Sequence, residues 1–415
     1  MIVAHGTGPG HDLPVPLFYA VAGGALAVFV TFLAVGVLWP ESRLRGAAAG
    51  RALPGLTRFV DASATRWTLR LVTMAFTVAV VVRGSMLPDN AHANPVPSVV
   101  YGVFWVGLVF ASLALGPVWR LLNPLRTVHA TATRLLGRDP RNGVVPLPQW
   151  IGYWPAAIGL FVFVWMELVS FDPDSVVGLA RFFTIYAIVH LAGAAVFGSG
   201  WFDRGDAFEV FSDLIGRLAF IGRRSDGVIA LRGPLNGLDS LRPATGLVAV
   251  VCVMLASTAY DSVTALWDYG TVNAGTVGLL VAVTCVIVLY SFAAKLAGIV
   301  GKRGRTVGAF VHSLIPIAAG YLIAHYLAYL VAESQRAAVL MVGSPATVNE
   351  KLLPAGLLAT IQVGAIVTGH VLGVVAAHDR AVRLFEPRVA IAGQTPMMVL
   401  MVVVTITGLT LLASG

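Results

Sequence analysis

Nine histidines and a small set of carboxylates are the side chains of this 415-residue chain that are best suited to chemistry. Several of them lie near the ends of apolar stretches that would reach the same side of a membrane. This outer set comprises His5, His11, His92, Glu167, Arg181, Asp261, His325 and Tyr326. Ionisable groups inside membrane segments are costly and usually face a bundle interior or a cavity. The outer set therefore predicts an outward-facing pocket for a small solute or a metal ion.

Imidazole and carboxylate ligands in such a pocket would suit zinc, copper or iron. The sequence nevertheless contains no H-E-x-x-H, H-x-H or C-x-x-C motif, so the metal hypothesis rests on convergence in space rather than on spacing. The cofactor is unknown at this stage, with copper or zinc preferred over haem. A simpler hypothesis is that the histidines form hydrogen bonds between packed helices, and that Glu167 and Arg181 form an ion pair that clamps two helices.

A second, inner set of histidines lies deeper in the apolar stretches. It comprises His190, His312, His370 and His378. His370 and His378 are eight residues apart, so they share one face of a helix. Facing histidines could ligate haem or relay protons. The alternative is hydrogen bonding between helices around Pro316.

The segments that carry these residues are apolar runs of about 20 residues, the length that spans a bilayer as a helix. The chain is 57% hydrophobic and only 12% charged, whereas soluble domains average about 25% charged residues. We therefore expect an all-α integral membrane protein, a single polytopic domain over residues 1–415. About ten spans are predicted, at 15–38, 67–86, 97–119, 151–170, 177–198, 244–260, 273–299, 307–332, 352–377 and 391–413.

The distribution of Lys and Arg sets the orientation of these spans. Five alternate loops hold 22 of these residues, and the remaining loops hold only Arg336 and Lys351. Basic loops face the cytoplasm, so both termini are expected outside, in a bacterial plasma membrane. The net charge of +8 is thus explained without a nucleic-acid partner, because the arginines form no stripe interleaved with aromatic residues.

Two cytoplasmic loops are long enough to hold further helices. In the first, Leu125, Val128, Ala132 and Leu135 recur at helical spacing. In the second loop, at 199–243, a stripe is formed by Phe208, Phe211, Ile215 and Leu218. Both segments predict amphipathic helices on the inner membrane surface, where they could also dock a partner within a membrane complex. Packing of these helices against the bundle is the alternative.

Several sequence stretches, taken in order, resemble one family. They are AHG at 4–6, DLPVP at 12–16, GPVWRLLNPLR at 116–126, GDAFEV at 205–210, STAYD at 257–261, and the segments 312–326 and 369–380. Over essentially the whole chain this pattern resembles bacterial polytopic membrane proteins, common in actinobacteria, that are labelled fenitrothion hydrolase-like. The resemblance implies hydrolysis of organophosphate triesters, with no residue-level mechanism to transfer.

Four functional hypotheses follow. The leading one is a membrane protein that binds or transports a small solute or metal ion through the outer pocket. The second is a membrane-embedded hydrolase of organophosphate-type esters, although the chain has no G-x-S-x-G nucleophile motif. The third is a haem- or copper-bearing redox subunit, and the fourth is a scaffold subunit of a larger complex.

Overall fold

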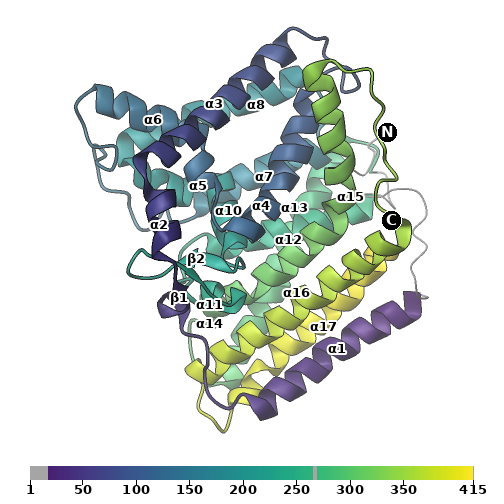
Figure 1. Ribbon diagram of the computed structural model, residues 1–415. Coiled ribbons are helices and arrows are strands. Elements are labelled where there is room, and N and C mark those ends of the chain that lie inside the picture. The colour runs from purple at the N-terminus through teal and green to yellow at the C-terminus, as the bar shows by residue number, and fades with distance from the viewer. Residues whose placement is uncertain (1–16, 265–268, 415) are drawn as a thin grey trace. The chain divides into compact units, whose positions relative to one another are not determined.

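The computed structural model describes residues 17–264 and 269–414, and helices form nearly all of its regular structure (Figure 1). Nine helices within these ranges are long and apolar enough to cross a membrane. They are α1 (Leu17–Leu38), α3 (Ser63–Ser85), η2 with α4 (Ser98–Leu115), α8 (Val176–Phe197), α12 (Leu247–Thr264), α13 (Val272–Val300), α14 to α15 (Thr306–Val342), α16 (Ala355–Leu384) and α17 (Ala390–Ser414). The chain is accordingly a multi-pass helical membrane protein.

Shorter elements connect the candidate spans or lie within them. The connecting helices are η1 (Gly46–Ala48), α2 (Pro54–Asp61), α5 (Trp119–Leu122), α6 (Pro124–Leu135), η3 (Ser199–Trp201), α9 (Phe202–Gly205), α10 (Ala207–Gly216) and α11 (Pro234–Asp239). Two spans are composite: a π-helix, η2 (Ser98–Val106), continues into α4 (Gly107–Leu115), and α14 (Thr306–Phe310) continues through η4 (Val311–Ser313) into α15 (Leu314–Val342). The sequence pattern had predicted no strands, yet a small antiparallel sheet of order β1-β3-β2 joins β1 (Arg51–Ala52), β2 (Ile221–Arg223) and β3 (Ile229–Leu231).

The fourth predicted span, at 151–170, corresponds to a shorter apolar helix. α7 runs over Trp154–Leu168, which is 15 residues, or about 22 Å at 1.5 Å per residue. A bilayer core of about 30 Å requires about 20 residues. The predicted count of ten therefore depends on how α7 is placed in the membrane, and the nine longer helices agree with the predicted positions.

The chain divides into two compact units that alternate along the sequence. The first unit contains Met1–Ala49, Gly233–Tyr329 and Lys351–Gly415, and the second contains Gly50–Arg232 and Leu330–Glu350. Each unit contributes several candidate spans. No change in composition marks the boundaries between the units, and one boundary lies inside α15. The sequence composition therefore does not indicate the division.

In the first unit, α1, α16 and α17 lie side by side, and α13 packs against α17 (Figure 1). α15 approaches α16 especially closely. A Cβ atom added at Gly320 would lie 2.5 Å from the carbonyl oxygen of Ala365, and one added at Gly369 would lie 2.5 Å from that of Pro316. Small residues allow such backbone contact between membrane helices, where lipid provides little hydrophobic drive for association.

A buried carboxylate fixes the segment that follows α1 to α16. Asp379, which is fully buried, accepts hydrogen bonds from the Trp39 indole (3.1 Å), the Ser42 hydroxyl (2.9 Å) and the backbone N–H of Arg43 (2.6 Å). The Arg383 guanidinium, one turn further along α16, pairs with the same carboxylate at 3.0 Å. These donors replace the water that the carboxylate loses on burial.

The second unit is built around aromatic side chains. Phe208 of α10 lies 5.0 Å from the ring of Phe163 on α7 and 5.3 Å from that of Tyr186 on α8. Trp105 of η2 lies 5.0 Å from Phe163. Edge-to-face contacts of this kind stabilise a core beyond the area they bury.

The two predicted amphipathic helices behave differently. On α6, Val128 and Leu135 of the predicted apolar stripe are exposed, while Arg126 and His129 are buried. Leu125, at the start of the stripe, instead packs against Trp201 and Phe202. On α10 nearly every residue is buried, including Phe208 and Phe211 of the predicted stripe. The prediction of a surface helix in 199–243 is therefore wrong, because α10 is enclosed by α4, α5 and α7 and its polar residues find partners there.

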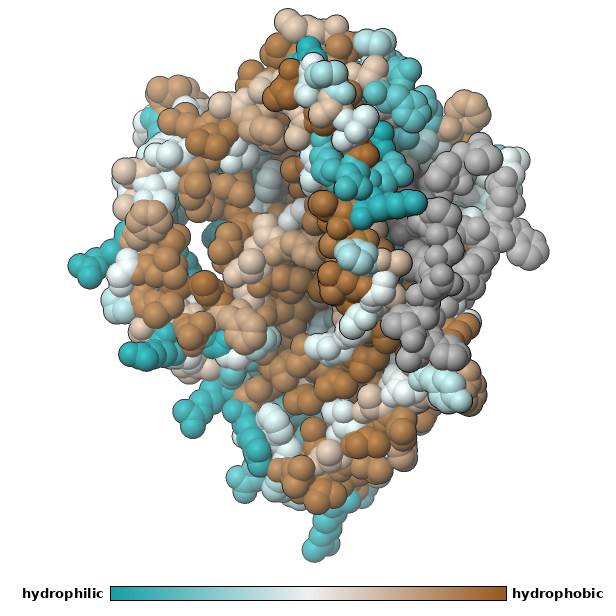
Figure 2. Space-filling model, turned by 45° about the vertical axis from the view of Figure 1, so that its right-hand side comes forward, coloured by the Kyte–Doolittle hydropathy of each residue, from teal (hydrophilic) through white to brown (hydrophobic). Residues whose placement is uncertain are grey.

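Figure 2 shows that apolar side chains cover much of the surface seen in that view. Exposed large apolar residues include Phe18 and Val37 on α1, Val81 on α3 and Phe292 on α13. Contiguous apolar surface of this extent is not tolerated in water. It is expected on helices that contact lipid.

The close contact between α15 and α16 predicts a position-dependent effect of a single methyl group. Gly369→Ala should lower the free energy of unfolding by about 1–3 kcal/mol, because the two backbones must separate. Gly364→Ala, on the same helix but with open space around its Cβ position, should be neutral or stabilising, since alanine favours helix. Thermal unfolding of the two variants in detergent tests this; equal transition temperatures would contradict the packing argument.

Candidate functional site

Three residues of the predicted outer set meet in the first unit. The Asp261 carboxylate, near the end of α12, lies 2.8 Å from Nε2 of His325 on α15. The same carboxylate oxygen accepts a hydrogen bond from the Tyr326 hydroxyl at 3.0 Å. All three residues are buried, with exposed fractions of 1–3%. Three members of the predicted outer set are thus in direct contact, and their role in an outward-facing pocket stays a prediction.

A fourth residue, Ser262, belongs to the same group and was missed by the sequence reasoning. Its Oγ lies 3.5 Å from Nδ1 of His325 and 3.1 Å from the carbonyl oxygen of Thr258. Because the Asp261 carboxylate accepts the proton of Nε2, Nδ1 is left as an acceptor facing this hydroxyl. The available signal was adjacency: Ser262 directly follows Asp261, although the recognised STAYD stretch ends one residue earlier.

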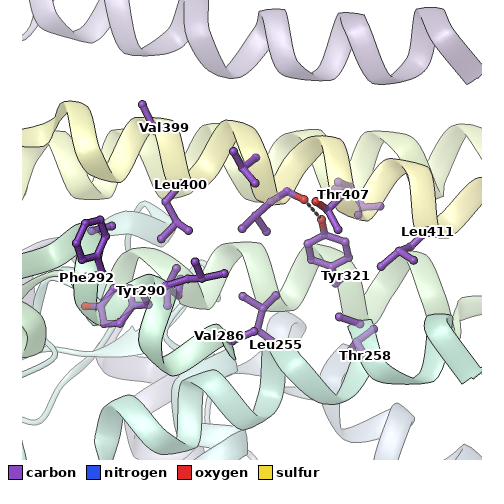
Figure 3. A pocket seen from close by; sticks show the side chains of 18 of the residues that line it. Leu255, Thr258, Val286, Tyr290, Phe292, Tyr321, Val399, Leu400, Thr407 and Leu411 are labelled. Atoms are coloured by element: carbon purple, nitrogen blue, oxygen red, sulfur yellow. Dashed lines mark hydrogen bonds between the residues drawn. The ribbon is translucent and has the colours of Figure 1, made fainter. Parts of the chain in front are cut away.

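This group lies at the wall of a cavity of about 680 Å³ in the first unit, to which Ser262 and His325 contribute lining atoms. The cavity extends along the helices, with Tyr290 and Phe292 towards one end and Thr258 and Leu411 towards the other (Figure 3). Its walls come from α12, α13, α15, α16 and α17 and are mostly aliphatic or aromatic. Tyr321 crosses it and donates its hydroxyl proton to the carbonyl of Val404 at 2.7 Å. A volume of this size and an apolar lining suit a drug-sized molecule.

The cavity is not closed on all sides. Several of its lining residues on α13 and α17 are also strongly exposed, with exposed fractions between 51% and 66%: Leu289, Phe292, Val399 and Val403. Both helices are candidate membrane spans. Part of the cavity wall is therefore exposed on the sides of two candidate spans.

The other members of the predicted outer set are not joined to this group by the described residues. His5 and His11 lie outside the described residues. Glu167 on α7 is buried and Arg181 on α8 is exposed, and both belong to the second unit. Their ion pair, and their convergence with His325, stay predictions.

The metal hypothesis finds only two suitable ligands in this group. Within 17–264 and 269–414, no three or more His, Cys, Asp or Glu side chains are placed to hold a metal ion together. Asp261 and His325 instead bind each other directly.

The inner histidines do not form one cluster in the described structure. His190 accepts a hydrogen bond from the indole of Trp201 at 3.0 Å within the second unit. In the first unit, Nε2 of His312 lies 3.3 Å from the carbonyl of Ala376. These contacts are the helix-to-helix hydrogen bonds of the simpler hypothesis.

The remaining two inner histidines share α16 but have different surroundings. His378 lies between the Trp39 carbonyl, 2.8 Å from Nε2, and the Gln394 side chain, 3.1 Å from Nδ1. His370 binds the Ile366 carbonyl through Nδ1 at 2.9 Å, and its buried Nε2 has no hydrogen-bond partner among the described residues. Neither arrangement supplies the facing pair that a haem would need.

A buried polar network in the second unit was not predicted. Arg126 on α6 pairs with Glu209 on α10 at 2.5 Å and with Asp203 at 2.8 Å. Asn123, which caps α6, donates to Asp206 and Glu209, and Tyr186 donates to Asp206 at 2.9 Å. Burial raises the pKa of the Glu209 carboxyl, and the adjacent Arg126 guanidinium opposes that rise. The network explains why the short helices α6 and α10 are held in place.

No family model, curated protein or solved structure matches this chain. The resemblance to fenitrothion hydrolase-like proteins therefore rests on the sequence motifs alone. Five of those motifs contain residues described above. STAYD ends in Asp261, the 312–326 segment ends in His325 and Tyr326, and GPVWRLLNPLR contains Asn123 and Arg126. GDAFEV contains Asp206 and Glu209, and the 369–380 segment contains His370 and His378.

The Arg126–Glu209 pair predicts a large loss of stability when one partner is neutralised. Glu209→Gln should lower the free energy of unfolding by about 3 kcal/mol, because the buried guanidinium loses its closest counter-charge. Asp213→Asn, on the same helix but in a pair that is partly exposed, should change it by less than about 1 kcal/mol. Denaturant or thermal unfolding measures both; similar losses would show that burial of the pair is unimportant.

Proposed function

We propose that this chain is a ten-span bacterial plasma-membrane protein, with both termini outside, that binds and moves an apolar small molecule through the cavity of its first unit. The observation that carries the proposal is the buried Asp261–His325 pair at the wall of this cavity. Ionisable residues in membrane helices cost free energy, and they usually mark a ligand site or a transport pathway. The pair would supply the polar contact, and the surrounding side chains the apolar one.

The lining favours an uncharged organic solute over a metal ion. Most lining side chains are hydrocarbon, and the polar ones are hydroxyls and a single imidazole, from residues such as Thr258, Ser262 and His325. Sites of this composition fix orientation with a few polar groups and obtain affinity from apolar area. The exposed wall on α13 and α17 would admit such a solute from the lipid.

The orientation part of the proposal rests on the loop charges. In the predicted topology both α12 and α15 run from the cytoplasmic side to the outer side. Asp261, near the end of α12, and His325 on α15 would therefore lie in the outer half of the membrane. Single cysteines accessible to a membrane-impermeant thiol reagent, placed in a basic loop and in a neutral loop, would test it. Labelling of the basic loops in intact cells would overturn the N-out orientation.

Filling the cavity should weaken binding. Val403→Trp places an indole at an exposed part of the cavity wall and should reduce the affinity for diethyl 4-nitrophenyl phosphate, an apolar triester, at least about tenfold. Equilibrium dialysis of the protein in nanodiscs measures this. Val72→Trp on α3, equally exposed but outside the cavity lining, is the control. Equal affinity in both variants would reject the cavity as the binding site.

A specific observation favours a second candidate, hydrolysis of the bound ester. Ser262, His325 and Asp261 are arranged as nucleophile, base and orienting carboxylate, the logic of serine hydrolases irrespective of fold. Catalytic hydrogen bonds are often long without substrate, and the Ser262–His325 distance of 3.5 Å is of this kind. The roles of the two ring nitrogens are exchanged relative to the common triad.

The reaction can be written with these groups alone. As Oγ of Ser262 attacks phosphorus, Nδ1 of His325 takes its proton, and the bond to the aryloxide breaks. His325 releases that proton to solvent. Water then attacks the phosphoserine ester while His325 takes a proton from it and returns one to the departing Ser262 oxygen, which yields the dialkyl phosphate. Asp261 would hold the imidazole and stabilise its charged form.

Ser262→Ala decides between the two candidates. If the protein is a hydrolase, this variant should release 4-nitrophenolate at least about 10³-fold more slowly than the unmodified protein, while still binding the triester. Ser257→Ala, one turn earlier on α12 with its hydroxyl bonded to the Met254 carbonyl, should retain activity. Accumulation of intact triester in vesicles, with no turnover by the unmodified protein, would instead support transport.

A further inference from the structure

Two arginines and a tryptophan form a compact group in the second unit, at the beginning of α3 and on α6. The guanidinium of Arg70 lies 5.6 Å from the centre of the Trp67 ring, and that of Arg134 lies 5.8 Å from the same ring. α3 and α6 pack against each other. The indole therefore holds two positive charges near one another through cation–π contacts.

The charge of this group is not balanced by carboxylates. Arg70 lies within electrostatic range of Arg66, Arg126 and Arg134. Arg66 pairs with Asp61, and Arg126 pairs with Glu209 and Asp203.

Arg70 and Arg134, in contrast, take part in none of the ion pairs formed by the described residues. Besides the contact with Trp67, Arg134 makes one long hydrogen bond, 3.4 Å, to the Ala130 carbonyl within the described part of the chain. Two like charges held together in this way call for an external anion.

The surroundings indicate what kind of anion. On α6, Val128, Leu135 and the following Leu136 are exposed, and on α3 Leu71 and Val72 are exposed. An anion that settles on the two guanidinium groups would thus lie beside apolar side chains. Tryptophan and arginine at the end of a membrane helix are typical of the headgroup region.

We propose that Arg70, Arg134 and Trp67 bind the phosphate of an anionic phospholipid of the inner leaflet, whose acyl chains extend along the exposed apolar residues of α3. The placement in the inner leaflet rests on the proposed N-out topology. Basic pockets between membrane helices on the cytoplasmic side bind lipid headgroups in this manner. The exposed stripe of α6 would lie on the same membrane surface.

Native mass spectrometry of the full chain in detergent, titrated with phosphatidylglycerol or phosphatidylcholine, tests the site directly. Arg70→Gln with Arg134→Gln should weaken phosphatidylglycerol binding about 30-fold, about 2 kcal/mol for two charges, and leave phosphatidylcholine binding unchanged. Arg58→Gln with Arg138→Gln removes the same charge from two exposed arginines and should have little effect.

Two further variants separate binding from folding. Arg134→Gln alone changes an exposed side chain on a surface helix, so the protein should fold and lose part of the affinity. Arg70→Lys with Arg134→Lys keeps both charges and should retain most of the affinity for phosphatidylglycerol. Equal phosphatidylglycerol affinity in the Gln double variant and its control, or equal affinity for both lipids in the unmodified chain, would overturn the proposal. Because titration in detergent does not depend on orientation, such a result would leave the proposed cavity function untouched.

Discussion

A charge that this protein buries must find its partner inside the protein, because lipid tails and apolar side chains offer no hydrogen bonds. Buried charges therefore mark the positions where hydrogen bonds and ion pairs connect separate helices. Asp379 gathers donors from the segment after α1, and Glu209 receives the guanidinium of Arg126. Apolar contacts bring these helices together without fixing their register, whereas a buried charge with directional partners permits only one arrangement. The Asp261–His325 pair obeys the same rule, but it differs in one respect: it borders a cavity.

This difference distinguishes the polar network that stabilises the second unit from the polar group at the cavity of the first unit. The Arg126–Glu209 network is enclosed by aromatic and aliphatic side chains, and its members satisfy one another. Asp261 is also satisfied, by His325 and Tyr326, yet the far nitrogen of His325 and the hydroxyl of Ser262 reach a space that can hold a ligand. Both candidate functions, transport and hydrolysis, use that single place. They differ in what happens to the ligand after it arrives.

The sequence predicted the features that depend on local composition and missed those that depend on packing. Hydropathy located the candidate spans, because each must be apolar over its own length. Loop charge also placed a larger outer set at one depth, and three of its members, Asp261, His325 and Tyr326, are in contact. The sequence could not show that α10 is enclosed, since a stripe such as Phe208 and Phe211 looks the same against lipid and against protein. Ser262 was missed because a hydroxyl in a helix ordinarily bonds its own backbone, and only the tertiary structure places it beside His325.

The exposed cavity wall on α13 and α17, where the proposed solute would enter from lipid, has a consequence for how selectivity would be achieved. A solute that arrives from lipid has already left water. The favourable free energy of removing its hydrocarbon surface from water, about 25 cal/mol per Å², is therefore released when it enters the bilayer and not when it enters the protein. The apolar wall can then discriminate only by shape. The small polar patch around His325 would then account for almost all recognition of functional groups. Apparent affinities measured from water would mainly reflect how strongly each compound partitions into the bilayer, and not how well it fits the cavity.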